Sequence, residues 1–229
     1  MVFAKILQTR PLGLAFDIDG TLSPIVLTPG AARLYPGVAE LLEEARQYAH
    51  IAIITGRGIE SGAALVNVEG ITYIGTHGVE WSEGLPDRHE VQINPLAQPY
   101  IAPGAELLDL AEYQLGNRPG ILIERKRLGG SVHYRLSPQP EETCELILTT
   151  LREAAQARNF YLSEGKSVVD IKPILSLNKG TELRNFAQRH NLAGLLFAGD
   201  DRTDLDAVLE IEHLRQDGLQ TASIAVQAP

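Results

Sequence analysis

Two aspartates stand at the end of an apolar run near the start of the chain. Residues 14–24 read LAFDIDGTLSP, which places Asp17 and Asp19 two positions apart and directly before Gly-Thr. Carboxylates at that spacing repel one another, so the stretch is either an exposed turn or a site that holds a positive charge. A calcium loop of the EF-hand type is excluded, because the position that requires glycine is Leu22.

Other polar residues also follow apolar runs. Thr55 comes after IAII, Asp200 comes after LLFAG, and Lys179 follows Asn178, a residue type favoured as a helix N-cap. In open α/β sheets the ligand crevice lies outside the carboxyl ends of the strands, so we expect these residues to meet there. Three carboxylates, a hydroxyl and an ammonium suit a phosphoryl group bound together with a divalent cation.

This set of residues predicts phosphoryl transfer. Asp17, Asp19 and Asp200 offer the hard oxygen ligands that Mg²⁺ prefers. Asp17 could attack phosphorus and form an aspartyl-phosphate. Asp19 could protonate the leaving oxygen and later activate the attacking water, while Lys179 and the Thr55 hydroxyl hold the other phosphoryl oxygens.

Each feature taken alone has a plainer interpretation. A D-x-D-G turn is common, Lys179 could lie on the surface, and Thr55 could be an ordinary hydroxyl at a strand end. The run GDDRTDLD could be a solvated helix start, where the helix dipole favours Asp201 and Asp204. Four histidines form no cluster with ligand-like spacing, and we interpret them as structural or exposed: His50, His89, His190 and His213.

The elements that would position these residues alternate between strand and helix patterns. Short apolar runs predict strands at 12–18, 51–55, 71–75, 195–199 and 222–226. After Pro36, a helical spacing joins Val38, Leu41, Leu42, Ala45, Tyr48 and Ala49, and a second helix is expected over 179–190. This alternation is typical of a parallel sheet in an α/β fold, here a core formed by residues 1–79 and 174–229.

The intervening segment, residues 80–173, predicts an inserted α/β cap. Two amphipathic helices and several strand-like pieces occur there, and GILIERK and SVHYRL are spaced as a hairpin. In SVHYRL the residues Val132, Tyr134 and Leu136 share the face expected under the helices. The opposite, open face would carry Glu124, Lys126, His133, Arg135 and Asp170.

That open face has two interpretations. Above a phosphate site it would form the roof of the crevice, but the polar side of an antiparallel sheet is often simply solvated. His133 and Arg135 could also fasten the hairpin within the cap.

Composition limits the possible partners. The chain has 229 residues, 44% of them hydrophobic, and a formal charge of −9, which disfavours nucleic acid and anionic membranes as partners. A single cysteine, Cys144, excludes an internal disulfide framework, and no apolar run is long enough for a signal peptide or a membrane span. We therefore expect a cytoplasmic monomer.

Four stretches together resemble the motifs of haloacid dehalogenase-like phosphatases, in their usual order. They are DIDGT at 17–21, ITGR at 54–57, Lys179, and GDDRTD at 199–204. The resemblance implies a Rossmann-like core, a bound Mg²⁺, and phosphate binding by Thr55, Gly56 and Lys179. An insertion after THGVE at 76–80 is similar to the second cap class of that superfamily.

The cap resembles that of trehalose-6-phosphate phosphatases. ERKRLGGSVHYR at 124–135 is similar to their E-x-K followed by H-Y-R, and EGKSVVDIKP at 164–173 to their G-K-x-V-x-E-x-x-P. The resemblance implies that Glu124 and Lys126 contact the sugar distal to the phosphate. Asp170 stands where that family has glutamate, one methylene longer.

The sequence therefore predicts a Mg²⁺-dependent phosphatase of a small sugar phosphate, with trehalose 6-phosphate as the first candidate. Asp170 leaves open another glycosyl phosphate, such as glucosyl- or mannosylglycerate phosphate. A sensor that only binds a sugar phosphate is the alternative from a different class. It would not need the complete set Asp17, Asp19, Lys179 and Asp200.

Overall fold

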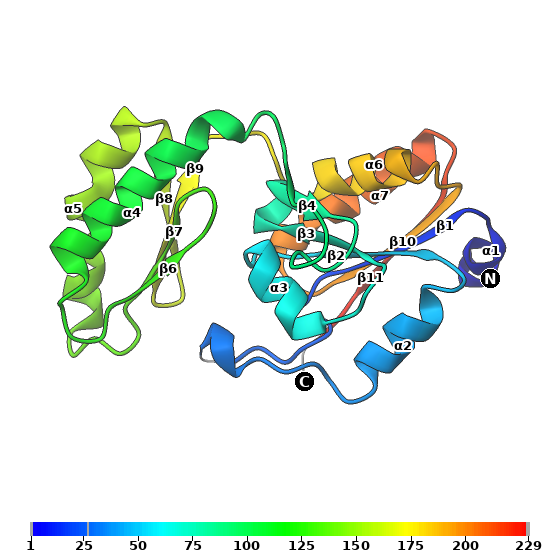
Figure 1. Ribbon diagram of the computed structural model, residues 1–229, viewed down its shortest axis with the longest axis horizontal. Helices are drawn as coiled ribbons and strands as arrows, with labels where there is room; N and C mark the ends of the chain where they lie inside the picture. Colours follow the sequence, from blue (N-terminus) through cyan, green and yellow to red (C-terminus); the bar gives the residue numbers. More distant parts are fainter. Residues whose placement is uncertain (1, 27, 228–229) are drawn as a thin grey trace. The chain divides into compact units, whose positions relative to one another are not determined.

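The computed structural model describes residues 2–26 and 28–227, which form two compact units. The first unit comprises the chain up to Ile93 and from Leu177 onward, and the second comprises Asn94–Ser176 (Figure 1). The expected α/β architecture, a parallel-sheet core with an inserted α/β cap, is confirmed. No helix within the described residues is long and apolar enough to cross a membrane.

The core unit is built on a seven-stranded sheet with the order β11-β10-β1-β2-β3-β4-β5. Its first five strands in that order are parallel: β11 (Gln220–Ala225), β10 (Gly194–Gly199), β1 (Leu12–Phe16), β2 (His50–Ile54) and β3 (Thr72–Gly75). β4 (Glu80–Ser82) pairs antiparallel with β3, and β5 (Gln92–Ile93) pairs antiparallel with β4.

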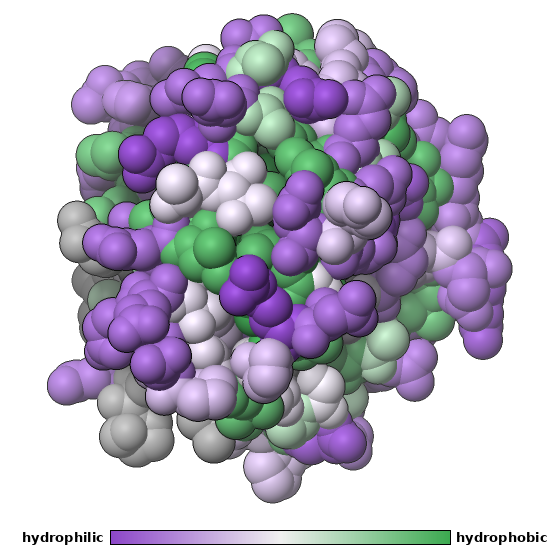
Figure 2. Space-filling model, turned by 90° about the vertical axis from the view of Figure 1, so that its left-hand side faces the viewer, coloured by the Kyte–Doolittle hydropathy of each residue, from purple (hydrophilic) through white to green (hydrophobic). Residues whose placement is uncertain are grey.

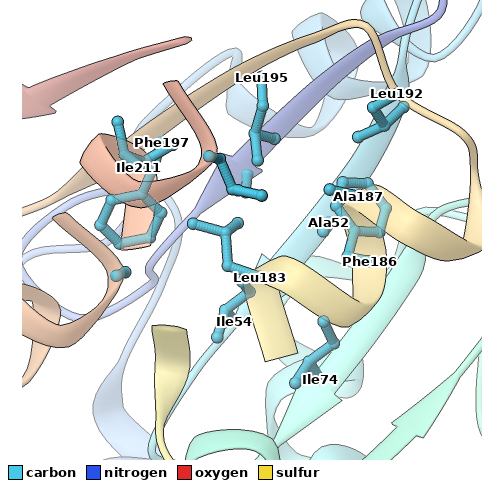
Figure 3. Packing of buried hydrophobic residues seen from close by; sticks show 13 residues of the cluster. Ala52, Ile54, Ile74, Leu183, Phe186, Ala187, Leu192, Leu195, Phe197 and Ile211 are labelled. Carbon is cyan, nitrogen blue, oxygen red and sulfur yellow. The ribbon is translucent and has the colours of Figure 1, made fainter. Parts of the chain in front are cut away.

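Helices cover both faces of this sheet, since alternate strand residues point to opposite sides. One face packs against α6 (Lys179–Arg189) and α7 (Leu205–Gln216), and the other against α2 (Val38–Ala45) and α3 (Ile59–Val66). Figure 3 shows Leu183 and Phe186 of α6 packed over Ile54 and Ile74 of the sheet. The N-terminal helix α1 (Val2–Gln8) buries Ile6 in a smaller cluster with Leu12 and Ala222.

The cap unit contains a four-stranded antiparallel sheet with the order β6-β7-β9-β8. The strands are β6 (Leu122–Arg125), β7 (Gly130–His133), β8 (Phe160–Gly165) and β9 (Val168–Pro173). Two helices, α4 (Ile101–Leu115) and α5 (Pro140–Ala157), pack on one face of it. On the side of the molecule that carries α5, Figure 2 shows hydrophobic surface interspersed with hydrophilic residues.

Four short 3-10 helices complete the described elements. They are Pro29–Ala31, Thr76–Gly78, Gln98–Tyr100 and Arg202–Asp204.

Two expectations about the fold differ from the structure. The division falls at 93/94 and 176/177 and not at 79/80 and 173/174, because β4 and β5 extend the core sheet beyond β3. The second difference concerns three apolar residues that were expected to be buried, since Leu41, Tyr48 and Leu136 are all exposed. Strand β7 ends at His133 and helix α2 at Ala45, so Leu136 and Tyr48 lie outside the regular elements whose periodicity was expected to bury them.

Candidate active site

Polar residues gather at the carboxyl edge of the core sheet. In the parallel register, Phe16 of β1 lies opposite Ala198 of β10 and Ile53 of β2, so these three strands end at the same edge. Asp17 follows β1 directly, and its main-chain N–H donates to the carbonyl of Ala198 at 3.0 Å. Thr55 follows β2 and Asp200 follows β10. The structure therefore brings together the three strand ends that the sequence predicts to meet.

Lys179 reaches this edge from the first residue of α6. Asn178 caps the helix: its side-chain oxygen accepts from the Thr181 N–H at 2.9 Å, and the Thr181 hydroxyl accepts from the Asn178 N–H at 3.1 Å. The Lys179 ammonium donates at 2.6 Å to both Asp17 Oδ1 and Asp204 Oδ1. Burial disfavours the charged ammonium, but the two carboxylates outweigh this effect and raise the pKa of Lys179.

Asp204 joins the site although the sequence suggested only a solvated helix start for it. It is buried, and its second carboxylate oxygen accepts from the main-chain N–H groups of Asp200 and Asp201 at 2.9 and 3.0 Å. This carboxylate therefore both fixes the turn after β10 and pairs with Lys179. In the sequence, only its position four residues after Asp200 in GDDRTD indicates that Asp204 lies near the site. Asp201 is exposed, as expected at a helix start.

Three carboxylates form a compact acidic group. One oxygen each from Asp17, Asp200 and Asp204 lies within 4.8 Å of the other two. Burial raises the pKa of Asp17 to about 7 against the opposing effect of Lys179, and burial together with Asp201 and Asp204 raises the pKa of Asp200. Three carboxylates beside one ammonium also carry more negative charge than that ammonium balances. Hard oxygen donors with excess negative charge fit a divalent cation such as Mg²⁺.

Asp19 does not belong to this group. Its two carboxylate oxygens accept from Arg57 Nε at 2.7 Å and from Arg57 Nη2 at 2.6 Å. Such a two-point pair fixes both side chains, and Asp204, not Asp19, completes the acidic group with Asp17 and Asp200. Arg57 ends the ITGR motif, but its spacing from Asp19 gives no sign that the two side chains meet.

A glycine permits the close approach of the loop after β1 to the loop after β10. Gly20 has a φ of 97°, and a Cβ atom there would lie 1.9 Å from Asp200 Oδ2. The neighbouring Thr21 hydroxyl donates to Asp200 Oδ1 at 3.3 Å. Only glycine allows the D-x-D-G turn to lie against Asp200 in this way.

In the cap, the face of the sheet away from α4 and α5 is polar, as the alternation predicts. Glu124 lies opposite Ser131, which lies opposite Asp170. Ser131 donates to Asp170 Oδ1 at 2.5 Å, and Lys172 pairs with Asp170 Oδ2 at 3.1 Å. Burial opposes ionisation of Asp170, but Lys126, Ser131 and Lys172 lower its pKa.

His133 and Arg135 make contacts inside the cap. His133 Nε2 lies 3.0 Å from Glu124 Oε2 across the hairpin, and Arg135 donates to the Lys166 carbonyl at 3.1 Å. Lys126 follows β6 and closes the hairpin, since its N–H donates to the Gly129 carbonyl at 2.9 Å. Both residues thus make hydrogen bonds that fasten the hairpin within the cap, as one of their two interpretations expects.

Comparison with known proteins identifies the family. A model of the trehalose-phosphatase family matches residues 15–228. The chain belongs to the trehalose-phosphatase family. It is 31% identical over 222 residues to a trehalose-phosphate phosphatase of Mycobacterium leprae, and 32% identical over 206 residues to one of Mycobacterium tuberculosis. These matches cover 93% and 88% of this chain but 51% of each relative. The chain therefore spans about half the length of these members of the family.

Solved structures share the fold. The crystal structure of a trehalose-6-phosphate phosphatase related protein superposes with a TM-score of 0.75 at 22% identity, covering 92% of this chain and 85% of the other. The C-terminal domain of a Candida albicans trehalose-6-phosphate phosphatase gives 0.73 at 22% identity, covering 94% and 78%. The chain therefore has the fold of these two structures.

Proposed function

We propose that this protein hydrolyses trehalose 6-phosphate to trehalose and phosphate. The observation that carries the proposal is the buried Lys179 ammonium, 2.6 Å from both Asp17 and Asp204, at the carboxyl edge of the core sheet in a chain of the trehalose-phosphatase family. A structure built only to bind a sugar phosphate has no need for a carboxylate at the point where a nucleophile would act.

Mg²⁺ is the cofactor that the acidic group fits best. Asp17, Asp200 and Asp204 would hold it through carboxylate oxygens, which converge within 4.8 Å of one another. When bound, the ion supplies positive charge that offsets the charges of the carboxylates and of a phosphoryl group. Asp19 is outside this set of converging oxygens, and its carboxylate pairs instead with Arg57.

Asp17 would act as the nucleophile. One of its oxygens would bond to phosphorus as the bond from phosphorus to the sugar oxygen breaks, which gives an aspartyl-phosphate and a free sugar. Asp19 would give a proton to the departing sugar oxygen and then take one from the water that displaces Asp17 from phosphorus. This role requires one Asp19 oxygen to exchange its hydrogen bond from Arg57 for the proton that it transfers. Arg57 holds the Asp19 carboxylate at a fixed place two residues from the nucleophile.

Lys179, Thr55 and Gly56 would bind the phosphoryl oxygens. Lys179 provides a buried positive charge in the first turn of a capped helix, where main-chain N–H groups also favour an anion. Thr55 is buried at the end of β2, and its hydroxyl oxygen accepts from the Arg57 N–H at 3.2 Å. Preorganised donors of this kind stabilise the charge that develops on a transferring phosphoryl group.

The polar face of the cap sheet would recognise the sugar. Glu124, Lys126 and Asp170 offer carboxylate acceptors and an ammonium donor for sugar hydroxyls. His133 and Arg135 would hold Glu124 and the hairpin in place, because both already bond within the cap. The contacts with Ser131 and Lys172 hold the Asp170 carboxylate close to the sheet. A sugar would therefore have to lie close to the sheet to reach this carboxylate.

A substrate panel tests this function. Phosphate release would be measured from trehalose 6-phosphate, glucosyl- and mannosylglycerate phosphates and a small aryl phosphate, each with Mg²⁺ and with a chelator. We expect trehalose 6-phosphate to have the highest kcat/KM and the chelator to abolish turnover. In the same assay, Glu124→Ala should reduce turnover of trehalose 6-phosphate by at least about tenfold and leave the aryl phosphate nearly unchanged.

Three outcomes would contradict the proposal. Faster hydrolysis of a glucosyl- or mannosylglycerate phosphate than of trehalose 6-phosphate would show that the proposed substrate is wrong. Tight binding of a sugar phosphate without turnover would favour the sensor. Equal losses on both substrates in Glu124→Ala would mean that the cap face does not recognise the sugar.

A further inference from the structure

The turn after β3 has an unusual backbone. Thr76, His77 and Gly78 have φ values of 49°, 54° and 105°, so three successive residues lie in the left-handed region. Two of them carry side chains, and Thr76 is β-branched, which makes this conformation unfavourable. Such residues persist only where their surroundings hold them in place, and they are most frequent at functional sites.

Main-chain hydrogen bonds join this turn to the loop after β2. The Thr76 N–H donates to the Arg57 carbonyl at 2.8 Å, and the His77 N–H donates to the Thr55 carbonyl at 3.0 Å. The His77 ring lies directly on Gly56, where an added Cβ would be 2.6 Å from its Cε1 atom. The position of the turn therefore determines the position of residues 55–57.

A buried carboxylate holds both sides of this junction. Glu80, on β4, is 1% exposed, and its Oε1 atom accepts from the Thr76 hydroxyl at 2.9 Å. The same oxygen accepts from the N–H of Ile59, the first residue of α3, at 3.0 Å. One side chain thus ties the left-handed turn to the helix that begins immediately after residues 55–58.

The loop held in this way, residues 55–58, contains residues proposed to bind phosphate and to hold Asp19. Thr55 and Gly56 are the proposed phosphate ligands, and Arg57 bonds both oxygens of Asp19. Glu80 bonds Thr76 and Ile59, the residues that flank this loop on the turn and on α3. A displacement of either would move the loop, and small displacements of binding groups are costly for catalysis.

We propose that Glu80 is a positioning residue for the phosphate-binding loop. It acts through Thr76 and Ile59 and does not touch the substrate. The inference rests on the proposed function, since it assumes that Thr55 and Gly56 bind phosphate. Its consequence is that removal of the Glu80 acceptor weakens binding of the phosphate end of any substrate and leaves discrimination between sugars unchanged.

The test measures the Kd of inorganic phosphate by calorimetry with Mg²⁺ present, together with kcat and KM. Glu80→Leu removes the acceptor and keeps most of the volume. We expect its Kd for phosphate to rise about tenfold or more, and kcat/KM to fall by the same factor for trehalose 6-phosphate and for an aryl phosphate. Glu80→Gln retains an acceptor oxygen and should stay within about threefold of wild type.

A matched control separates positioning from stability. Thr221→Val removes a buried hydrogen bond to the Ile211 carbonyl on the far edge strand β11 and should lower the melting temperature without changing the Kd for phosphate. Thr76→Val removes only the hydroxyl bond to Glu80. If Glu80→Leu fails to fold, Thr76→Val should still raise the Kd in the same direction by a smaller factor.

The failures of the two proposals are distinguishable. Glu80→Leu with wild-type Kd and wild-type kcat/KM, in a protein whose wild type binds phosphate and turns over, would overturn this inference alone. Wild type that hydrolyses the aryl phosphate but not trehalose 6-phosphate would overturn the proposed substrate, and the Glu80 effect on the Kd should remain. Wild type that binds no phosphate would overturn both.

Discussion

Asp204 is the residue that changes the interpretation of the site most. Its two carboxylate oxygens have different tasks, since one pairs with the Lys179 ammonium and the other accepts from two N–H groups of the turn after β10. Lys179 is consequently held between two carboxylates and is aligned with Asp17. In the sequence, an aspartate at a helix start has an ordinary explanation in the helix dipole, which conceals this role.

Asp204→Asn tests this arrangement. An amide can present only one acceptor, so either Lys179 or the turn would lose its partner inside the protein. We expect the free energy of unfolding to fall by about 3–5 kcal/mol and turnover to fall at least about 100-fold. Denaturant unfolding and phosphate release measure the two effects.

Asp206→Asn is the control, because Asp206 lies exposed in the first turn of the same helix. Its unfolding midpoint and turnover should match wild type. Equal behaviour of Asp204→Asn and Asp206→Asn would show that Asp204 has no special task.

At the scale of elements, the ends of the parallel core strands could be predicted from the sequence. The two short strands β4 and β5 at the edge of the sheet could not. Asp17, Thr55 and Asp200 follow runs of buried apolar residues, and Asn178 marks the start of α6 through its capping chemistry. The strands β4 and β5 contain three and two residues, too few for a periodic pattern, so the core sheet was expected to end at β3.

Side-chain direction was the other unpredictable quantity. Spacing places Asp17 and Asp19 on one loop, but only the fold brings the Arg57 guanidinium to Asp19 and the Lys179 ammonium to Asp17. Similarly, helical spacing predicts burial of Leu41, which is exposed because α2 buries a narrower stripe around Leu42. Contacts between distant parts of the chain decide both outcomes.

His190, directly after α6, is expected to make the stability of the fold depend on pH. His190 stacks on His50 of β2, with ring centroids 4.3 Å apart, and touches Phe186; Glu83 and Arg189 are its charged neighbours. Burial lowers the pKa of His190, with His50 and Arg189 acting in the same direction and Glu83 against it. The unfolded chain therefore takes up a proton first as the pH falls through about 6.5, so stability is complete above that pH and declines below it.

Melting temperatures of wild type and His190→Gln at pH 8 and pH 5.5 measure this effect. The loss between the two pH values should be smaller in His190→Gln. His213 is an exposed histidine on α7, and His213→Gln should show the same fall in melting temperature between the two pH values as wild type. Identical losses in all three proteins would contradict the assignment.

At the scale of the whole molecule, the proposed function assigns phosphate binding and sugar recognition to different units of the chain. The core unit carries the carboxylates, Lys179 and the loop held by Glu80, all at the edge where the parallel strands end. The cap unit carries a polar sheet face whose members are linked by hydrogen bonds. Under the proposed function, chemistry at phosphorus and selection of the sugar could vary independently, and Asp170 is a position at which selection could change.

We propose Asp17 as the nucleophile of a trehalose-6-phosphate phosphatase. The most direct measurement is phosphate release from trehalose 6-phosphate, with Mg²⁺, by wild type and by Asp17→Asn. We expect turnover by wild type, and a loss of at least about 1,000-fold in Asp17→Asn, because an amide cannot form the aspartyl-phosphate. Wild-type turnover by Asp17→Asn would contradict this proposal.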